Sequence, residues 1–137
     1  MTADSIAIAF DQLRAQRRSI DSVLAEARSR LRRMTPIEAI AARDAGAVVV
    51  DIRPAAQRQA EGGPDEVLVV ERNVLEWRFD PASSARLPIA DYDLEVIVLC
   101  QEGYTSSLAA AALQDLGLWR ATDVIGGWDA WRTATAR

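Results

Sequence analysis

Residues 95–118 read EVIVLCQEGYTSSLAAAALQDLGL, and the architecture of the chain follows from them. Residues 95–99 form a short apolar run rich in β-branched side chains, which predicts a buried strand. Residues 106–116 are rich in alanine and end at Gly117, which is typical of a helix and its C-terminal stop. A loop that begins at Cys100 joins the two. This order of strand, loop and helix indicates an α/β protein.

The loop carries the one cysteine of the chain, Cys100, directly after the strand. Open α/β sheets bind ligands at the carboxyl ends of their strands. Gly103 lets the loop curl, and the start of the following helix offers unpaired N–H groups to an anion. We expect the N–H groups of residues 101–106 to form a cradle that favours the thiolate of Cys100, with the hydroxyls of residues 105–107 directed into it.

A second interpretation of this loop stays open at this point. A lone cysteine after a buried strand is often a small hydrophobic residue without chemical function. Gly103 and the serines that follow would then form only an ordinary turn and helix cap.

Strand and helix signals alternate over the rest of the chain from residue 35. Thr35, Pro36 and Glu38 form a helix-start signature, with threonine as N-cap and glutamate three residues later. The further predicted helices are 35–45, 54–61 and 128–133, with a helical turn at 73–79 and a loop at 80–93. The further predicted strands are 47–52, 67–70 and 122–125. This alternation predicts a parallel sheet covered by helices on both faces.

Residues 5–34 contain neither glycine nor proline, and their apolar positions recur every three or four residues. This pattern predicts an amphipathic helix, either continuous or split into two near Ser19. We favour a helix that packs on its own domain, and the pattern also fits a helix through which two copies of the chain associate. We therefore divide the chain into an N-terminal helical extension, 1–33, and an α/β domain, 34–137.

The extension holds seven arginines and four acidic residues. We expect the arginines to form a solvated face rather than a patch that binds nucleic acid. They are Arg14, Arg17, Arg18, Arg28, Arg30, Arg32 and Arg33.

The composition excludes several kinds of chemistry. The chain has no histidine, all its basic residues are arginines, and its net charge is -4. A Ser-His-Asp triad, a histidine-ligated metal site and a Schiff-base lysine are therefore excluded, and one cysteine permits no internal disulfide. The negative charge argues against nucleic acid as a partner. No signal peptide and no apolar run long enough for a bilayer is present, so we expect a cytoplasmic protein without a membrane partner.

The loop also differs from that of cysteine-dependent phosphatases. Those enzymes place an arginine six positions after the cysteine, where it clamps the phosphoryl oxygens. Here that position is Ser106, and no arginine occurs between Arg86 and Arg120. A phosphatase of that type would need an arginine from elsewhere in the chain.

Three separated segments resemble the rhodanese-like sulfurtransferase domain family, in particular its single-domain bacterial members. Residues 35–54, TPIEAIAARDAGAVVVDIRP, are similar to the opening helix and strand of the family, with Asp51 and Arg53 in matching places. Residues 100–106 resemble the active loop Cys-x-x-Gly-x-Thr/Ser-x. VIGGWDAW, residues 124–131, is similar to the closing Gly-Gly-x-x-x-Trp. The likeness covers residues 35–133, and the order and spacing of the three segments make it specific.

The resemblance implies a three-layer α/β domain with a parallel sheet of about five strands. It also implies that Cys100 takes a sulfane sulfur from thiosulfate or a persulfide and passes it, as a cysteine persulfide, to a thiol or to cyanide. No metal or organic cofactor is implied. Asp51 and Arg53 are expected to tie loop backbone together near the site. The expected substrate-binding residues are Gln101, Glu102, Gly103, Tyr104, Thr105, Ser106 and Arg58.

Two departures from the family pattern bear on the activity. Glu102 puts a negative charge where an anionic donor would arrive, which disfavours thiosulfate. The usual Gly-His-Ile-Pro-Gly-Ala is replaced by residues 62–67, GGPDEV, so the rim of the site is altered. The second hypothesis is accordingly a catalytically weak binding or regulatory module.

Overall fold

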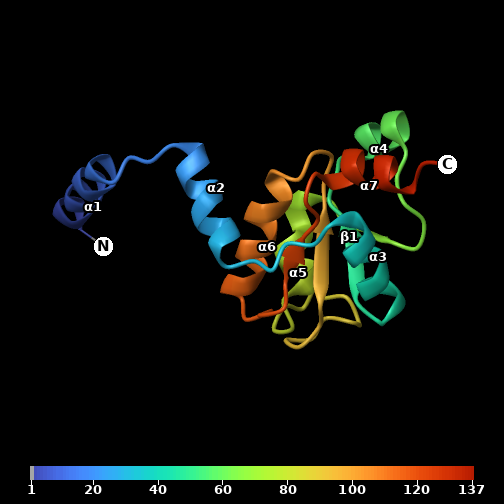
Figure 1. The fold of residues 1–137 in the computed structure, drawn as a ribbon. Coiled ribbons are helices and arrows are strands. Elements are labelled where there is room, and N and C mark those ends of the chain that lie inside the picture. The colour runs from blue at the N-terminus through green and yellow to red at the C-terminus, as the bar shows by residue number, and fades with distance from the viewer. Residues whose placement is uncertain (1) are drawn as a thin grey trace.

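Four parallel strands in the order β2-β1-β3-β4 form the centre of the structure, a computed structural model that describes residues 2–137 (Figure 1). The strands are β1 (Val48–Asp51), β2 (Leu68–Val69), β3 (Val96–Leu99) and β4 (Thr122–Asp123). β1 and β3 pair along their whole length, so Asp51 lies opposite Leu99 and both strands end at the same edge of the sheet.

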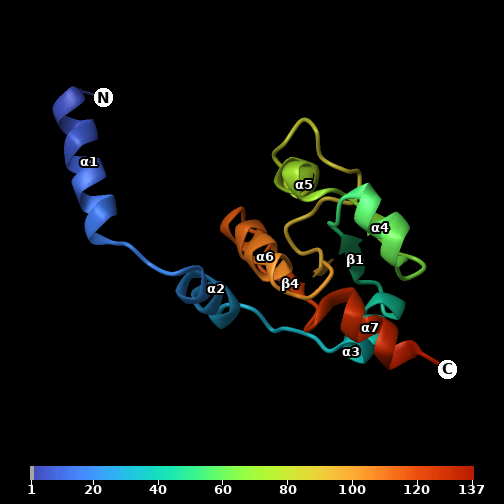
Figure 2. The same ribbon diagram turned by 90° about the horizontal axis from the view of Figure 1, so that it is seen from above.

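Helices cover both faces of the sheet, as predicted (Figure 2). α3 (Pro36–Asp44) and α7 (Gly127–Thr135) lie on one face, and η1 (Arg72–Val74), α5 (Leu75–Phe79) and α6 (Thr105–Asp115) lie on the other. α4 (Ala55–Glu61) follows β1 and lies beside α7, where the Trp128 indole N–H donates to the Glu61 carbonyl at 2.9 Å. The three-layer α/β class is therefore confirmed.

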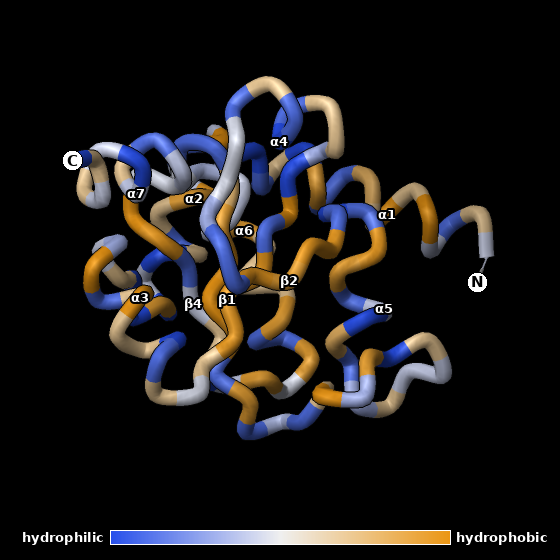
Figure 3. The backbone as a smooth tube through the Cα atoms, turned by 90° about the vertical axis from the view of Figure 1, so that its right-hand side faces the viewer, coloured by the Kyte–Doolittle hydropathy of each residue, from blue (hydrophilic) through white to orange (hydrophobic). Residues whose placement is uncertain are grey.

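The side chains of β3 alternate between two apolar clusters, one on each face of the sheet. Val96 and Val98 pack with α5 and α6, while Ile97 and Leu99 pack with α3 and α7. All four side chains are fully buried. In Figure 3 the neighbouring strands β1 and β2 lie on segments coloured as hydrophobic. Burial on both faces fixes the register of β3, because a shift by one residue would exchange the two clusters. Cys100 is thereby held at the edge of the sheet.

Residues 2–137 form the four strands that the sequence pattern predicts, and the number of about five that the resemblance implies is wrong. At the position of a fifth strand, Met34 makes a single parallel bridge to Val124. Thr35 ends this extended backbone at once because it caps α3, and Glu38 completes the predicted capping box. The backbone and side-chain hydrogen bonds of Thr35 hold the pKa of Glu38 below its usual value.

The N-terminal residues form two helices rather than a continuous one, with the break near Ser19. α1 (Ala3–Ala15) and α2 (Ile20–Ser29) are separate, and Ser19 caps α2. α2 packs on the outer side of α6 and buries Leu24 and Ala27 (Figure 1). α1 buries no side chain and extends away from the domain in both views. Packing on the domain is thus confirmed for α2 and wrong for α1. Within residues 2–137 no helix is long and apolar enough to cross a membrane.

Candidate active site

Two backbone N–H groups converge on the sulfur of Cys100. The amide nitrogens of Gly103 and Ser106 lie 3.2 Å and 3.4 Å from Sγ. Ser106 belongs to the first turn of α6, so the positive end of that helix also faces the sulfur. Cys100 is only 4% exposed, and hydrogen bonds to an anion are stronger where water is excluded. The arrangement is suited to hold a negatively charged sulfur atom.

The loop carbonyls near the cysteine are held from the opposite side by the start of α7. The Trp128 N–H donates to the Cys100 carbonyl at 2.8 Å, and the Asp129 N–H donates to the Gln101 carbonyl at 3.1 Å. This approach requires Gly127, where φ is +60° and a Cβ atom would overlap the Cys100 carbonyl oxygen. The start of α7 therefore fixes the first two peptide units of the loop after Cys100.

Gly103 is required for a second close approach. Its φ is +84°, and a Cβ atom there would lie 2.7 Å from the Gly126 nitrogen and 3.1 Å from the Val124 carbonyl oxygen. Both atoms belong to the backbone and cannot rotate away. The active loop is therefore pressed directly against the turn between β4 and α7.

Arg53 lies just after β1 in a buried ion pair and joins this end of the strand to the active loop. Arg53 forms a bidentate pair with Asp51, with Nη2 to Oδ2 at 2.7 Å, and both residues are almost completely buried. Arg53 also donates to the Gly62 carbonyl and to Oε1 of Gln101, each at 2.8 Å. The Gln101 amide then donates to Asp129 at 2.7 Å. The side chain of Gln101 is thus engaged within the protein.

Comparison with known proteins agrees with this geometry. The family model of the rhodanese-like domain matches residues 35–134, which include the cysteine loop, the Asp51–Arg53 pair and the Gly-Gly turn. The chain belongs to the rhodanese-like domain family.

Relatives of this rhodanese-like domain include bacterial enzymes named thiosulfate sulfurtransferase GlpE. The one from Pseudomonas savastanoi pv. phaseolicola is 33% identical over 101 residues, which are 74% of this chain and 87% of the relative. The one from Pseudomonas fluorescens SBW25 is 34% identical over 105 residues, which are 77% of this chain and 88% of the relative.

Solved structures with a similar fold include the following two. A protein of unknown function from Rhodopseudomonas palustris, described as a possible tyrosine phosphatase, is 35% identical with a TM-score of 0.77 and covers 85% of this chain and 91% of its own. The human single-domain sulfurtransferase TSTD1 has a TM-score of 0.65 at 19% identity and covers 76% of this chain and 97% of its own, which supports the fold alone.

The serine hydroxyls of this rhodanese-like domain do not point into the cradle, contrary to expectation. Ser106 and Ser107 each donate their hydroxyl to Oδ2 of Asp123 at 2.7 Å. Asp123 is fully buried at the end of β4, and a buried carboxylate requires such donors. Ser106 therefore donates its backbone N–H to the sulfur, while its side chain binds Asp123 and fixes the start of α6.

Two arginines expected on a solvated face instead hold the active loop. Arg28 donates through Nη2 to the Gly103 carbonyl at 2.8 Å and through Nε to Ser107 Oγ at 3.1 Å. Arg33 donates to the same carbonyl at 3.0 Å and pairs with Asp123 at 2.9 Å. These partners are 70 to 90 residues apart in the chain, so no local pattern indicated Arg28, Arg33 or Asp123 as site residues.

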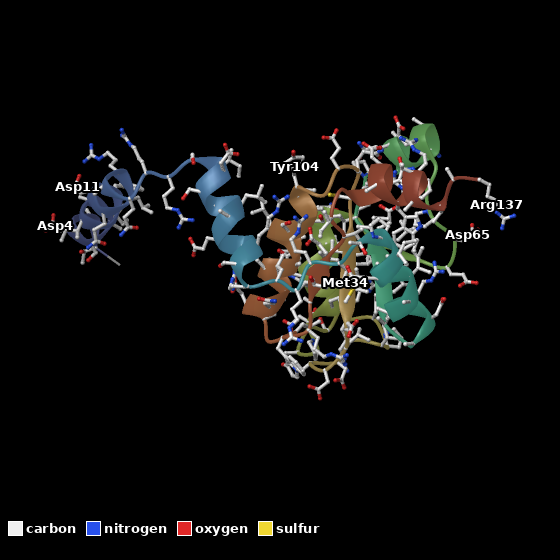
Figure 4. The ribbon with its side chains drawn as sticks, viewed as in Figure 1. Asp4, Asp11, Met34, Asp65, Tyr104 and Arg137 are labelled. Atoms are coloured by element: carbon white, nitrogen blue, oxygen red, sulfur yellow. The ribbon has the colours of Figure 1, made fainter. Side chains whose placement is uncertain are left out.

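The remaining predicted site residues lie at the rim or farther away. Glu102, Tyr104 and Thr105 are exposed, and Figure 4 shows Tyr104 on the loop before α6. The Arg28 guanidinium lies 5.5 Å from the centre of the Tyr104 ring. Arg58 is half-buried on α4, and its Nε has no hydrogen-bond partner among the described residues. No cluster of three metal-ligating side chains occurs in residues 2–137.

Proposed function

We propose that this rhodanese-like domain is a sulfurtransferase in which Cys100 carries the transferred sulfur. The observation that supports the proposal most directly is the pair of N–H groups, from Gly103 and Ser106, on a sulfur at a helix start. Such donors favour the thiolate, which is the nucleophilic form of cysteine, without the help of a histidine. The relatives named thiosulfate sulfurtransferase support the same class of reaction.

The reaction is a pair of displacements at sulfur. The Cys100 thiolate attacks the sulfane sulfur of the donor and forms a new S–S bond, while the bond from that sulfur to the rest of the donor breaks. The electron pair leaves with sulfite or with the donor thiolate. An acceptor thiolate or cyanide then attacks the outer sulfur of the persulfide, and the Cys100 thiolate leaves. Electrons and atoms balance without an external oxidant.

The cradle would stabilise the negative charge on the outer sulfur of the persulfide. Its donors are the backbone N–H groups of the loop, because the Gln101 amide is held by Arg53 and Asp129. We assign Glu102, Tyr104 and Thr105 to the rim that meets the donor, and Arg58 to a weaker contact from α4. The exposed charge of Glu102 opposes the approach of the dianion thiosulfate. A thiolate enzyme of this kind fits a reducing compartment such as the cytoplasm.

Intact-mass spectrometry tests the proposal. The reduced protein is incubated separately with thiosulfate and with glutathione persulfide, and we expect a gain of one sulfur atom that Cys100→Ser abolishes. The persulfidated protein should lose that sulfur to a thiol or to cyanide. A reduced protein that gains no sulfur from either donor would exclude the proposal.

The low exposure of Cys100, 4%, favours the second hypothesis, a binding or regulatory module without turnover. Alkylation of the native protein by iodoacetamide separates the two. A sulfur that reacts only after unfolding would support the module.

We further propose that α1 is a surface through which two copies of the chain associate. Ile6, Phe10 and Leu13 are exposed along this helix, which buries no side chain in its own chain. Exposed apolar residues at helical spacing are typical of an interface between helices.

A further inference from the structure

The segment that follows α1, residues 20–34, packs on α6 and β4 and reaches the active loop through two arginines. α2 packs on α6, and just after it the Arg30 guanidinium pairs with Asp115 at 2.6 Å. The Gln114 amide donates to the Arg30 carbonyl at 3.0 Å, and the Met34 N–H donates to the Asp123 carbonyl at 3.0 Å. Residues 20–34 are therefore attached at several points, although the family match begins at residue 35.

The same segment supplies two guanidinium groups to a single carbonyl of the loop. Arg28 and Arg33 donate to the oxygen of Gly103 at 2.8 Å and 3.0 Å. The N–H of Gly103 points the other way, to the Cys100 sulfur at 3.2 Å. The two groups belong to adjacent peptide units, so the arginines fix the unit that directly follows the N–H group facing the sulfur.

The two arginines differ in their charge balance. The charge of Arg33 is compensated by the buried carboxylate of Asp123. Within residues 2–137 no carboxylate forms an ion pair with Arg28. The Arg28 side chain is half-buried, and its guanidinium lies over the Tyr104 ring. A positive charge without a counter-ion in a half-buried place favours a nearby anion.

We propose that Arg28 is a positioning residue for Cys100, supplied to the rhodanese-like domain by the N-terminal segment. It holds the peptide unit that follows Gly103, and with it the shape of the loop around the sulfur, and its charge stabilises the thiolate across the loop. The functional unit accordingly begins near residue 20. The use of this thiolate in catalysis rests on the proposed function, but its ionisation can be measured without any sulfur donor.

The test is the rate of Cys100 alkylation by iodoacetamide as a function of pH. Because the chain has one cysteine, the measured rate belongs to Cys100 alone. For Arg28→Ala we expect a rate about threefold to tenfold lower at neutral pH, a profile displaced to higher pH and an unchanged plateau. Arg28→Lys should restore most of the rate, because an ammonium group keeps the charge and donates to a carbonyl. Arg32→Ala is the matched control, since Arg32 is exposed and should leave the profile in place.

Three results would overturn the proposal. An Arg28→Ala profile that coincides with the wild type, even with a lower melting temperature, would leave Arg28 a purely structural role. An equal displacement of the pH profile in Arg32→Ala would show that the effect comes from the net charge of the protein alone. If Arg28→Ala does not fold, Arg28→Gln keeps an amide donor and removes only the charge, and an undisplaced profile in this variant would likewise overturn the proposal. Because no donor is used, these results are independent of whether sulfur transfer occurs.

Discussion

The amide nitrogen of Gly103 lies 3.2 Å from the sulfur of Cys100. Among the described residues, the groups that donate hydrogen bonds to this sulfur are backbone N–H groups rather than side chains. The absence of a Cβ atom at Gly103 makes this contact compatible with the tight packing of the loop on the Gly126 backbone. We therefore expect the reactivity of Cys100 to depend on the shape of the loop more than on any one side chain.

Gly103→Ala should disturb the loop severely. A methyl group would lie 2.7 Å from the Gly126 nitrogen, at a φ of +84° that side chains rarely adopt. We expect a loss of about 2–4 kcal/mol in the free energy of unfolding, measured in urea, and a lower rate of Cys100 alkylation.

Gly46→Ala is the control for the backbone angle alone. Gly46 has a φ of +112° but nothing within 4 Å of the position of a methyl group. We expect this variant to lose only about 1 kcal/mol and to keep its alkylation rate. Equal losses in the two variants would show that the close approach of the loop to Gly126 contributes nothing.

Glu102→Gln should make the protein a better acceptor of sulfur from thiosulfate. Removal of an exposed negative charge at the rim reduces the repulsion of a dianion, and we expect kcat/KM to rise about twofold to fivefold at low ionic strength. The gain should vanish in about 1 M salt, where charges are screened within about 3 Å. Asp44→Asn is the control, since Asp44 is exposed at the end of α3 that leads into β1, at the end of the sheet opposite Cys100. An equal gain in the control would mean that only the net charge matters.

Asp123→Ala should destabilise the whole domain. The Asp123 carboxylate accepts hydrogen bonds from Arg33, Ser106 and Ser107, and its removal leaves a partly buried cation and two hydroxyls without their partner. We expect a loss of about 3–5 kcal/mol in the free energy of unfolding. Asp115→Ala removes the exposed partner of Arg30 and should cost about 0–1 kcal/mol. A cost below about 1 kcal/mol for Asp123→Ala would show that this network does not hold the site together.

Phe10→Glu should weaken association between copies of the chain. Phe10 is 60% exposed on α1, and a charge there would oppose burial against a second helix. Light scattering over a range of concentrations should show a dimer for the wild type and a monomer for Phe10→Glu. Trp77→Glu changes a similarly exposed aromatic residue, 57% exposed on α5, and should leave the dimer intact. A wild-type chain that is monomeric at high concentration would exclude this role for α1.

Most of the fold could be predicted because its signals are local. The capping box at Thr35 and the stop at Gly117 concern residues a few positions apart, and the structure confirms the helices they bound. The pattern predicted the four strands that form, but the resemblance implied about five. The fifth is missing because Met34 makes only one bridge, to Val124 just after β4, and α3 begins directly afterwards.

The site likewise has one part that local sequence patterns predicted and another part that they did not. The sequence by itself determined that Cys100 follows a buried strand and precedes a helix, because periodicity and glycine positions act within one short segment. Only the tertiary structure decided that the serine hydroxyls donate to Asp123 and that Arg28 and Arg33 bind the Gly103 carbonyl. A guanidinium group can bind a carbonyl or carboxylate on any element that the fold brings near it. Its partner is therefore set by the packing of α2 on α6, which no local pattern records.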